Sequence, residues 1–149
     1  QSVKYKDFEL NFSQQLEKIS EQASTDLPPL PPIDKLTLTK NAQFLPNQSI
    51  LQAWVKVDKS AEQLLLKHLP NIHIHQEQRY KFIGQSLLNH HLITNKQAKL
   101  FNELRQLRNK VAHAPDYEVN TVLALQYIDL CFALIEAFET DSSIKNVAG

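Results

Sequence analysis

The strongest constraint on the fold is a repeat of inward-facing positions between residues 47 and 69. The repeat advances by three or four residues at each step, which is the spacing that lines one face of an α-helix. Its positions are occupied by Ile50, Trp54, Val57, Ala61, Leu64 and His68. Pro70 then ends the helix, because proline lacks the backbone N–H group that would continue it. We therefore expect a long helix, with Trp54 as a core anchor, that needs other elements to cover its apolar face.

Three more helices are predicted after this one. The first spans about residues 76–91, and Gly84 inside it would allow a neighbouring helix to approach closely. Its inward positions are Tyr80, Ile83, Leu87 and, as a further candidate, His90. The second begins where Thr94 and Gln97 form a capping box. The last covers about residues 119–139 and is apolar on nearly every face, which predicts a central place in a bundle or a contact between two copies.

The segment before residue 47 has a different pattern. Apolar and polar residues alternate over residues 3–12, which is typical of a strand, and a short helix is expected over residues 13–24. Residues 26–33 contain four prolines within five positions, which favours an extended linker. The sequence thus predicts an all-α fold, an up-and-down bundle of four to five helices over residues 47–140. An irregular N-terminal segment, residues 1–46, precedes the bundle, and a polar tail, residues 141–149, follows it.

Composition limits the function. Lys plus Arg and Asp plus Glu both number 16, and the resulting zero net charge argues against a protein that coats nucleic acid by bulk electrostatics. Contact with RNA would need a local basic patch. The candidates on one predicted helix are Lys96, Lys99, Arg105, Arg108 and Lys110. Only two glycines are present, without a Gly-rich loop, so a nucleotide-driven enzyme of the P-loop or Rossmann kind is not expected.

The single cysteine, Cys131, excludes an internal disulfide and fits a reducing compartment, where it is best interpreted as a buried small hydrophobe. No apolar run approaches the length of about 20 residues that spans a membrane, so a cytoplasmic location is expected. The chain has no methionine and begins with Gln1, which predicts a piece of a longer product. The missing part could hold a membrane anchor, another domain or a tag.

Histidine pairs suggest a metal only weakly. His73 and His75 have a spacing found in metal sites, but no Cys, Asp or Glu lies at ligand spacing beside them. A loop that leads into a helix is the simpler interpretation, and no metal or other cofactor is expected.

The candidate functional site is the end of the helix that carries Leu104, Leu107 and Val111 on its apolar stripe. Arg108 lies beside this stripe, and His113 follows five positions later. On a straight helix the two side chains would diverge by roughly 140° and about 7.5 Å of rise. Pro115 disfavours helical backbone just before it, so the helix should loosen at residues 112–114 and free His113 to turn back.

A cation and an imidazole in one cleft suit the cleavage of RNA without a metal. Histidine titrates near neutral pH and can take the proton of the ribose 2′-OH group. Arginine stays charged, and its planar donors match the oxygens of a phosphate. Asn109 could add a polar contact to the pair.

The residues from Arg108 to His113, with Asn109 directly after the arginine, resemble the R-x4-6-H motif of HEPN domains. The flanking residues, roughly 47–139, are also similar to the common bacterial version of that domain. The resemblance implies an all-α bundle, often a homodimer, that acts as a metal-independent endoribonuclease in toxin–antitoxin or phage-defence systems. It implies catalytic roles for Arg108, Asn109 and His113, with Arg and His of two protomers meeting at the interface. An antitoxin or defence partner would then be expected besides RNA.

Two other interpretations stay open. The Arg108 and His113 pair could be structural, with Arg108 in a salt bridge and His113 capping the helix, in which case the bundle would be a non-catalytic binding module. The chain could also be the cytosolic part of a larger protein attached to a membrane.

Overall fold

The computed structural model describes residues 2–23 and 33–148, with side chains placed for residues 4–21 and 34–140. The regular secondary structure of these residues is entirely helical, which confirms the all-α prediction. In chain order the helices are α1 (Ser2–Ala23), α2 (Ile33–Asn41), α3 (Pro46–His68), α4 (Arg79–Asn89), α5 (Asn95–Ala112) and α6 (Thr121–Ala148).

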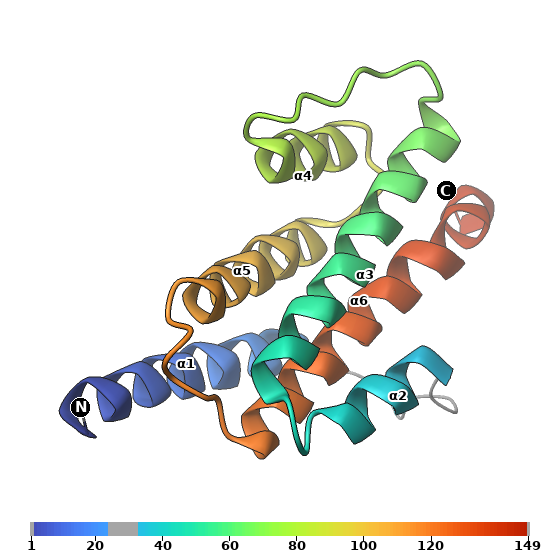
Figure 1. Ribbon diagram of the computed structural model, residues 1–149. Helices are drawn as coiled ribbons and strands as arrows, with labels where there is room; N and C mark the ends of the chain where they lie inside the picture. Colours follow the sequence, from blue (N-terminus) through green and yellow to red (C-terminus); the bar gives the residue numbers. More distant parts are fainter. Residues whose placement is uncertain (1, 24–32, 149) are drawn as a thin grey trace.

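The centre of the molecule is the pair of α3 and α6, which lie side by side in Figure 1. Asn47 at the start of α3 hydrogen-bonds the backbone just before α6, so both helices begin at the same end and run in the same direction. The helices α4, α5 and α1 lie beside this pair, and α5 contacts both of its neighbours in that layer. Among the described helices, α2 packs only on α3 and α6, and ion pairs from Lys35 to Asp129 and from Asp34 to Lys56 hold it there.

The predicted strand-like pairing of residues 3–12 is wrong, because α1 is a regular helix from Ser2 to Ala23. The helix predicted over residues 13–24 is confirmed as the second half of α1. The alternation of apolar and polar residues suggested a strand, but a helical repeat also passes through this segment. Its apolar positions recur every three or four residues and are Phe8, Phe12, Leu16 and Ile19. Phe12, Leu16 and Ile19 are buried against the bundle, whereas Leu10, which belongs to the alternating pattern, is 55% exposed. The helix therefore buries more apolar surface than an unpaired strand could. Most of the predicted Pro-rich linker lies outside the described residues.

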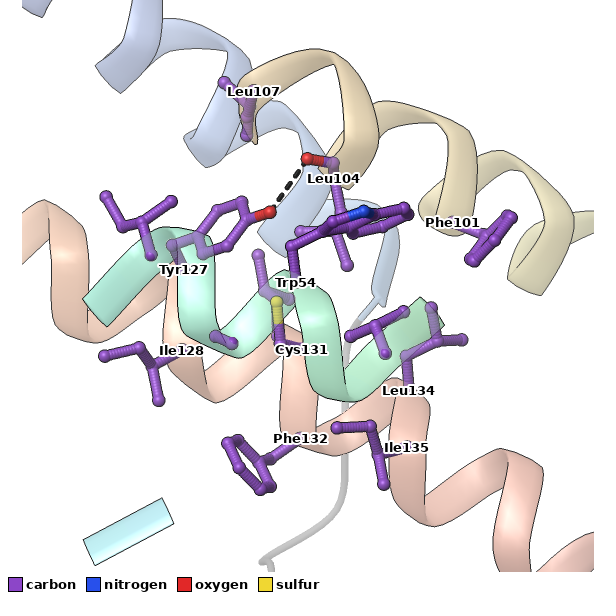
Figure 2. Close-up of a cluster of buried hydrophobic side chains, with 14 of the residues drawn as sticks. Trp54, Phe101, Leu104, Leu107, Tyr127, Ile128, Cys131, Phe132, Leu134 and Ile135 are labelled. Carbon is purple, nitrogen blue, oxygen red and sulfur yellow. Dashed lines mark hydrogen bonds between the residues drawn. The ribbon is translucent and has the colours of Figure 1, made fainter. Parts of the chain in front are cut away.

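The core lies where α3, α5 and α6 meet, and Figure 2 shows its side chains. Trp54 is 2% exposed and contacts Phe101 of α5 at 5.1 Å between ring centroids, which confirms it as a core anchor. Tyr127 is fully buried, and its hydroxyl donates to the backbone carbonyl of Leu104 at 2.9 Å. Cys131 is also fully buried, as expected for a small hydrophobe.

The ends of two helices differ from the expectation. Helix α4 covers only Arg79–Asn89, and His90 directly after it is exposed, so that side chain does not face inward. Helix α6 continues through the predicted polar tail to Ala148. Within α6, Thr121–Thr140 is long and apolar enough to cross a membrane by composition, contrary to the sequence-based expectation, but 56% of that stretch is buried, as in the core helix of a soluble protein.

Candidate functional site

The candidate site lies at the C-terminal end of α5. The helix begins with the predicted capping box: the Thr94 hydroxyl accepts from the Gln97 backbone N–H at 3.1 Å, and the Gln97 side chain accepts from the Thr94 backbone N–H at 2.9 Å. It ends at Ala112, and His113 is the C-cap residue with φ −93° and ψ 2°. The predicted loosening of the helix before Pro115 is therefore confirmed.

Arg108 lies at the edge of the core. Its side chain is half-buried, and its Nη1 atom donates to Oδ1 of Asn109 at 3.2 Å. Its Nε atom is shielded from water and has no hydrogen-bond partner among the described residues. Burial raises the pKa of Tyr127 well above its ordinary value, and the nearby positive charge of Arg108 acts in the opposite direction. The structure thus brings Arg108 and Asn109 together and sets the arginine charge beside the core.

His113 is exposed to solvent. No hydrogen bond links its imidazole to Arg108 or Asn109 in the part of the chain that the structure describes, and its backbone N–H bonds to the Asn109 carbonyl at 2.9 Å. Because α5 is regular up to Ala112 and the His113 N–H still bonds to the Asn109 carbonyl, backbone positions 108 and 113 are about 140° apart around the helix axis. The two residues therefore leave the helix end in different directions.

The connection after His113 is fixed by contacts that the sequence patterns did not reveal. Asn47 of α3 donates to the Tyr117 carbonyl at 2.7 Å and accepts from the Val119 backbone N–H at 2.8 Å. Tyr5 of α1 donates to the Glu118 carbonyl at 2.7 Å, and its ring packs against Tyr117. These bonds join residues at least 70 positions apart, so no local pattern could have indicated them. Together they hold the segment that carries His113 against α1 and α3.

The three arginines of the chain have different electrostatic surroundings. Arg79 at the start of α4 is paired with two carboxylates of α3, Asp58 and Glu62, and is only 18% exposed. Arg105 and Arg108 on α5 have no acidic partner among the described residues. Their positive charges are therefore not neutralised by a carboxylate in the described structure, while Arg79 serves to join α4 to α3.

The histidines of the loop between α3 and α4 do not complete a metal site. The rings of His73 and His75 lie 5.1 Å apart, between centroids. No group of three His, Cys, Asp or Glu side chains that could hold a metal ion occurs within the described ranges. The pair packs instead against Phe82 of α4, through His75.

Comparison with known proteins gives no relative: no family model, curated protein or solved structure matches this chain.

Proposed function

We propose that this chain is a metal-independent endoribonuclease of HEPN type, with Arg108, Asn109 and His113 as its catalytic residues. The observation that carries the proposal is the state of Arg108. A half-buried guanidinium without an acidic partner in the described structure lies on the same helix end as an exposed histidine. A fixed cation that lacks an internal counter-charge is suited to bind the phosphate of a substrate.

In the proposed reaction the imidazole of His113 accepts the proton of a ribose 2′-OH group. The 2′ oxygen attacks the adjacent phosphorus, and the bond between phosphorus and the 5′ oxygen breaks. A protonated histidine returns a proton to that 5′ oxygen. Arg108 holds the phosphate oxygens while charge builds on them, and Asn109 keeps the guanidinium oriented through the bond from Nη1. The products are a 2′,3′-cyclic phosphate and a 5′-hydroxyl.

The proposal includes a homodimer, because Arg108 and His113 of one chain leave the helix end in different directions and no hydrogen bond joins their side chains in the described structure. In such a dimer the C-terminal ends of the two α5 helices would lie against each other. Arg108 of one copy could then approach His113 of the other copy. The biological setting that fits is a bacterial toxin or phage-defence role in the cytoplasm, with RNA as substrate and an antitoxin or defence protein as partner.

The test is incubation of the purified protein with labelled single-stranded RNA in the presence of EDTA. Cleavage should persist in the chelator and leave 2′,3′-cyclic phosphate ends. Arg108→Ala and His113→Ala should each lower the rate by at least about 100-fold, the usual scale for losing an acid–base or charge-stabilising group. The far-UV circular dichroism spectrum should stay unchanged in both variants.

Control variants are available outside the candidate site. His73→Ala removes another exposed histidine, and Lys59→Ala removes an exposed cation of α3, so both should cleave like the wild type. Mixing the Arg108→Ala and His113→Ala proteins tests the shared site, because a mixed dimer can rebuild one intact pair and should regain part of the activity. Full cleavage by both single variants would exclude the assignment.

The alternative is a non-catalytic binding module in which Arg108 is structural. The burial of its Nε atom beside the core favours this reading. It predicts that Arg108→Ala lowers the melting temperature and that the wild-type protein cuts no RNA.

A further inference from the structure

A stack of aromatic rings ends in a cation on the same helix as the candidate site. The ring of Trp54 lies against Phe101 at 5.1 Å and, edge-on, against Tyr80 at 5.6 Å, both between centroids. The guanidinium carbon of Arg105 then lies 5.7 Å from the centre of the Tyr80 ring. The stack thus runs from the buried core at α3, through α4, to the half-exposed surface of α5.

Arg105 is held in place without being neutralised. Its Nη2 atom donates to Oδ1 of Asn102 at 2.9 Å, one turn earlier on α5. The neighbouring positive charge, Arg79, is already bound by Asp58 and Glu62, so those carboxylates are engaged elsewhere. The guanidinium group of Arg105 therefore lies over the Tyr80 ring and is held by Asn102. It has no acidic partner in the described structure.

One buried donor beside this stack is also unused. The indole Nε1–H of Trp54 is shielded from water and has no hydrogen-bond partner among the described residues, although the residue is only 2% exposed. Figure 2 shows this nitrogen at the edge of the ring that faces α5, between Leu104 and Phe101. The rings packed around this stack come from four helices, because Trp54 of α3 contacts Tyr80 of α4 and Phe101 of α5, and Phe101 contacts Phe138 of α6.

Arg105 lies three residues before Arg108, which on α5 corresponds to about 4.5 Å of rise and about 60° of rotation. Two guanidinium groups without an acidic partner in the described structure thus occur on adjoining parts of one helix. A phosphate at Arg108 would place the neighbouring nucleotide within reach of Arg105, since successive bases of a single strand follow the backbone at similar spacing. Planar guanidinium groups stack on unpaired bases, and this is one of the main ways in which proteins bind single-stranded RNA.

We propose that Arg105, supported by Tyr80, stacks on an unpaired nucleobase next to the phosphate that Arg108 holds, and so selects single-stranded RNA. This inference rests on the proposed function for the placement of the phosphate. The base would complete a layered stack of nucleobase, guanidinium and Tyr80 ring. Recognition by stacking tolerates every base, so it selects unpaired structure rather than sequence.

The test measures binding of a fluorescein-labelled 12-nucleotide single-stranded RNA by fluorescence anisotropy, in the His113→Ala background so that the RNA stays intact. Arg105→Ala should weaken binding about 30-fold, the middle of the range for losing one stacked base. Arg105→Lys keeps the charge but loses the flat face, so it should weaken binding nearly as much. Tyr80→Phe keeps the ring beneath Arg105 and should bind like the parent protein.

The outcomes separate this inference from the proposed function. If Arg105→Lys binds as tightly as the parent protein, Arg105 acts only by its charge and the stacking proposal is wrong, whether or not the wild type cleaves RNA. If both Arg105 variants bind weakly while no form of the protein cleaves RNA, the stacking proposal stands and the nuclease proposal falls. A double-stranded RNA of the same length is the control, because its paired bases are already stacked, and its affinity should be the same for Arg105→Lys and the parent protein.

Discussion

Two buried side chains on α6 make the stability of the folded chain depend on pH. Cys131 and Tyr127 lie one helical turn apart, and both are fully buried. Burial raises the pKa of the Cys131 thiol far above its ordinary value of 9.0, and it raises the pKa of the Tyr127 hydroxyl above 10.0. Both groups therefore stay protonated in the folded chain at a pH where they would ionise in the unfolded chain.

The Cys131 thiol gives a prediction with a defined sign. Its pKa is raised on folding, so its contribution to stability is complete below about pH 9 and is lost as the pH rises above that value. Above about pH 9 the free energy of unfolding of the wild type should fall faster than that of Cys131→Ala, by up to about 1.4 kcal/mol per pH unit. Urea titrations at several pH values measure both slopes. Equal slopes would show that the thiol does not titrate differently in the two states.

At the scale of single helices, a glycine of α4 lies on the side of that helix that faces α5. Gly84 has ordinary helical backbone, since it is not among the positive-φ residues. A Cβ atom added there would lie 3.5 Å from Cδ2 of Phe101, which is an ordinary van der Waals contact. The close approach expected from the sequence is therefore present, but it leaves room for one more carbon atom.

Gly84→Ala should accordingly stabilise the protein. Alanine favours a helix interior over glycine by about 0.5–1 kcal/mol, and here the added methyl group also gains contact with Phe101. Thermal unfolding followed at 222 nm, together with urea titration, measures the change. The matched comparison is Gly84→Val, whose larger side chain should overpack the contact with Phe101 and destabilise the protein. A loss of stability in Gly84→Ala would mean that α4 and α5 approach more closely than the structure indicates.

At the scale of the whole molecule, the connection from α5 to α6 is the place where distant parts of the chain meet. Asn47 supplies both a donor and an acceptor to it, and Asn120 caps α6 by accepting from the Leu123 backbone N–H while it donates to Glu9 of α1. The positions of α1, α3 and α6, and of the segment with His113, are therefore linked through these few polar side chains.

Asn47→Ala should destabilise the protein by about 1–3 kcal/mol, because it leaves the Tyr117 carbonyl and the Val119 N–H without their partner in a partly buried place. Amide hydrogen exchange over residues 113–120 should quicken more than exchange in the middle of α6. Tyr5→Phe removes one exposed hydrogen bond to the same connection and should cost less than half as much. Equal protection of residues 113–120 in wild type and Asn47→Ala would rule out this role of Asn47.

Local patterns were enough to predict much of this protein. The repeat from Ile50 to His68, the stop at Pro70 and the capping box of Thr94 and Gln97 are short-range features, and α3 and α5 follow them closely. The burial of Trp54 and Cys131 also followed from their apolar surroundings in the sequence. The end of α5 before Pro115 was predictable because proline acts on its nearest neighbour.

Tertiary structure alone decided the rest. The pattern of residues 3–12 is compatible with a strand and with a helix. The helix forms because its apolar face packs against α5 and α6. The partners of Arg79, the bonds of Asn47 and the ring beneath Arg105 join residues far apart in the chain, so no spacing rule could supply them. For the same reason the sequence determined that Arg108, Asn109 and His113 share one helix end, while the packing of that helix decided that Arg108 turns to Asn109 beside the core and His113 faces the solvent.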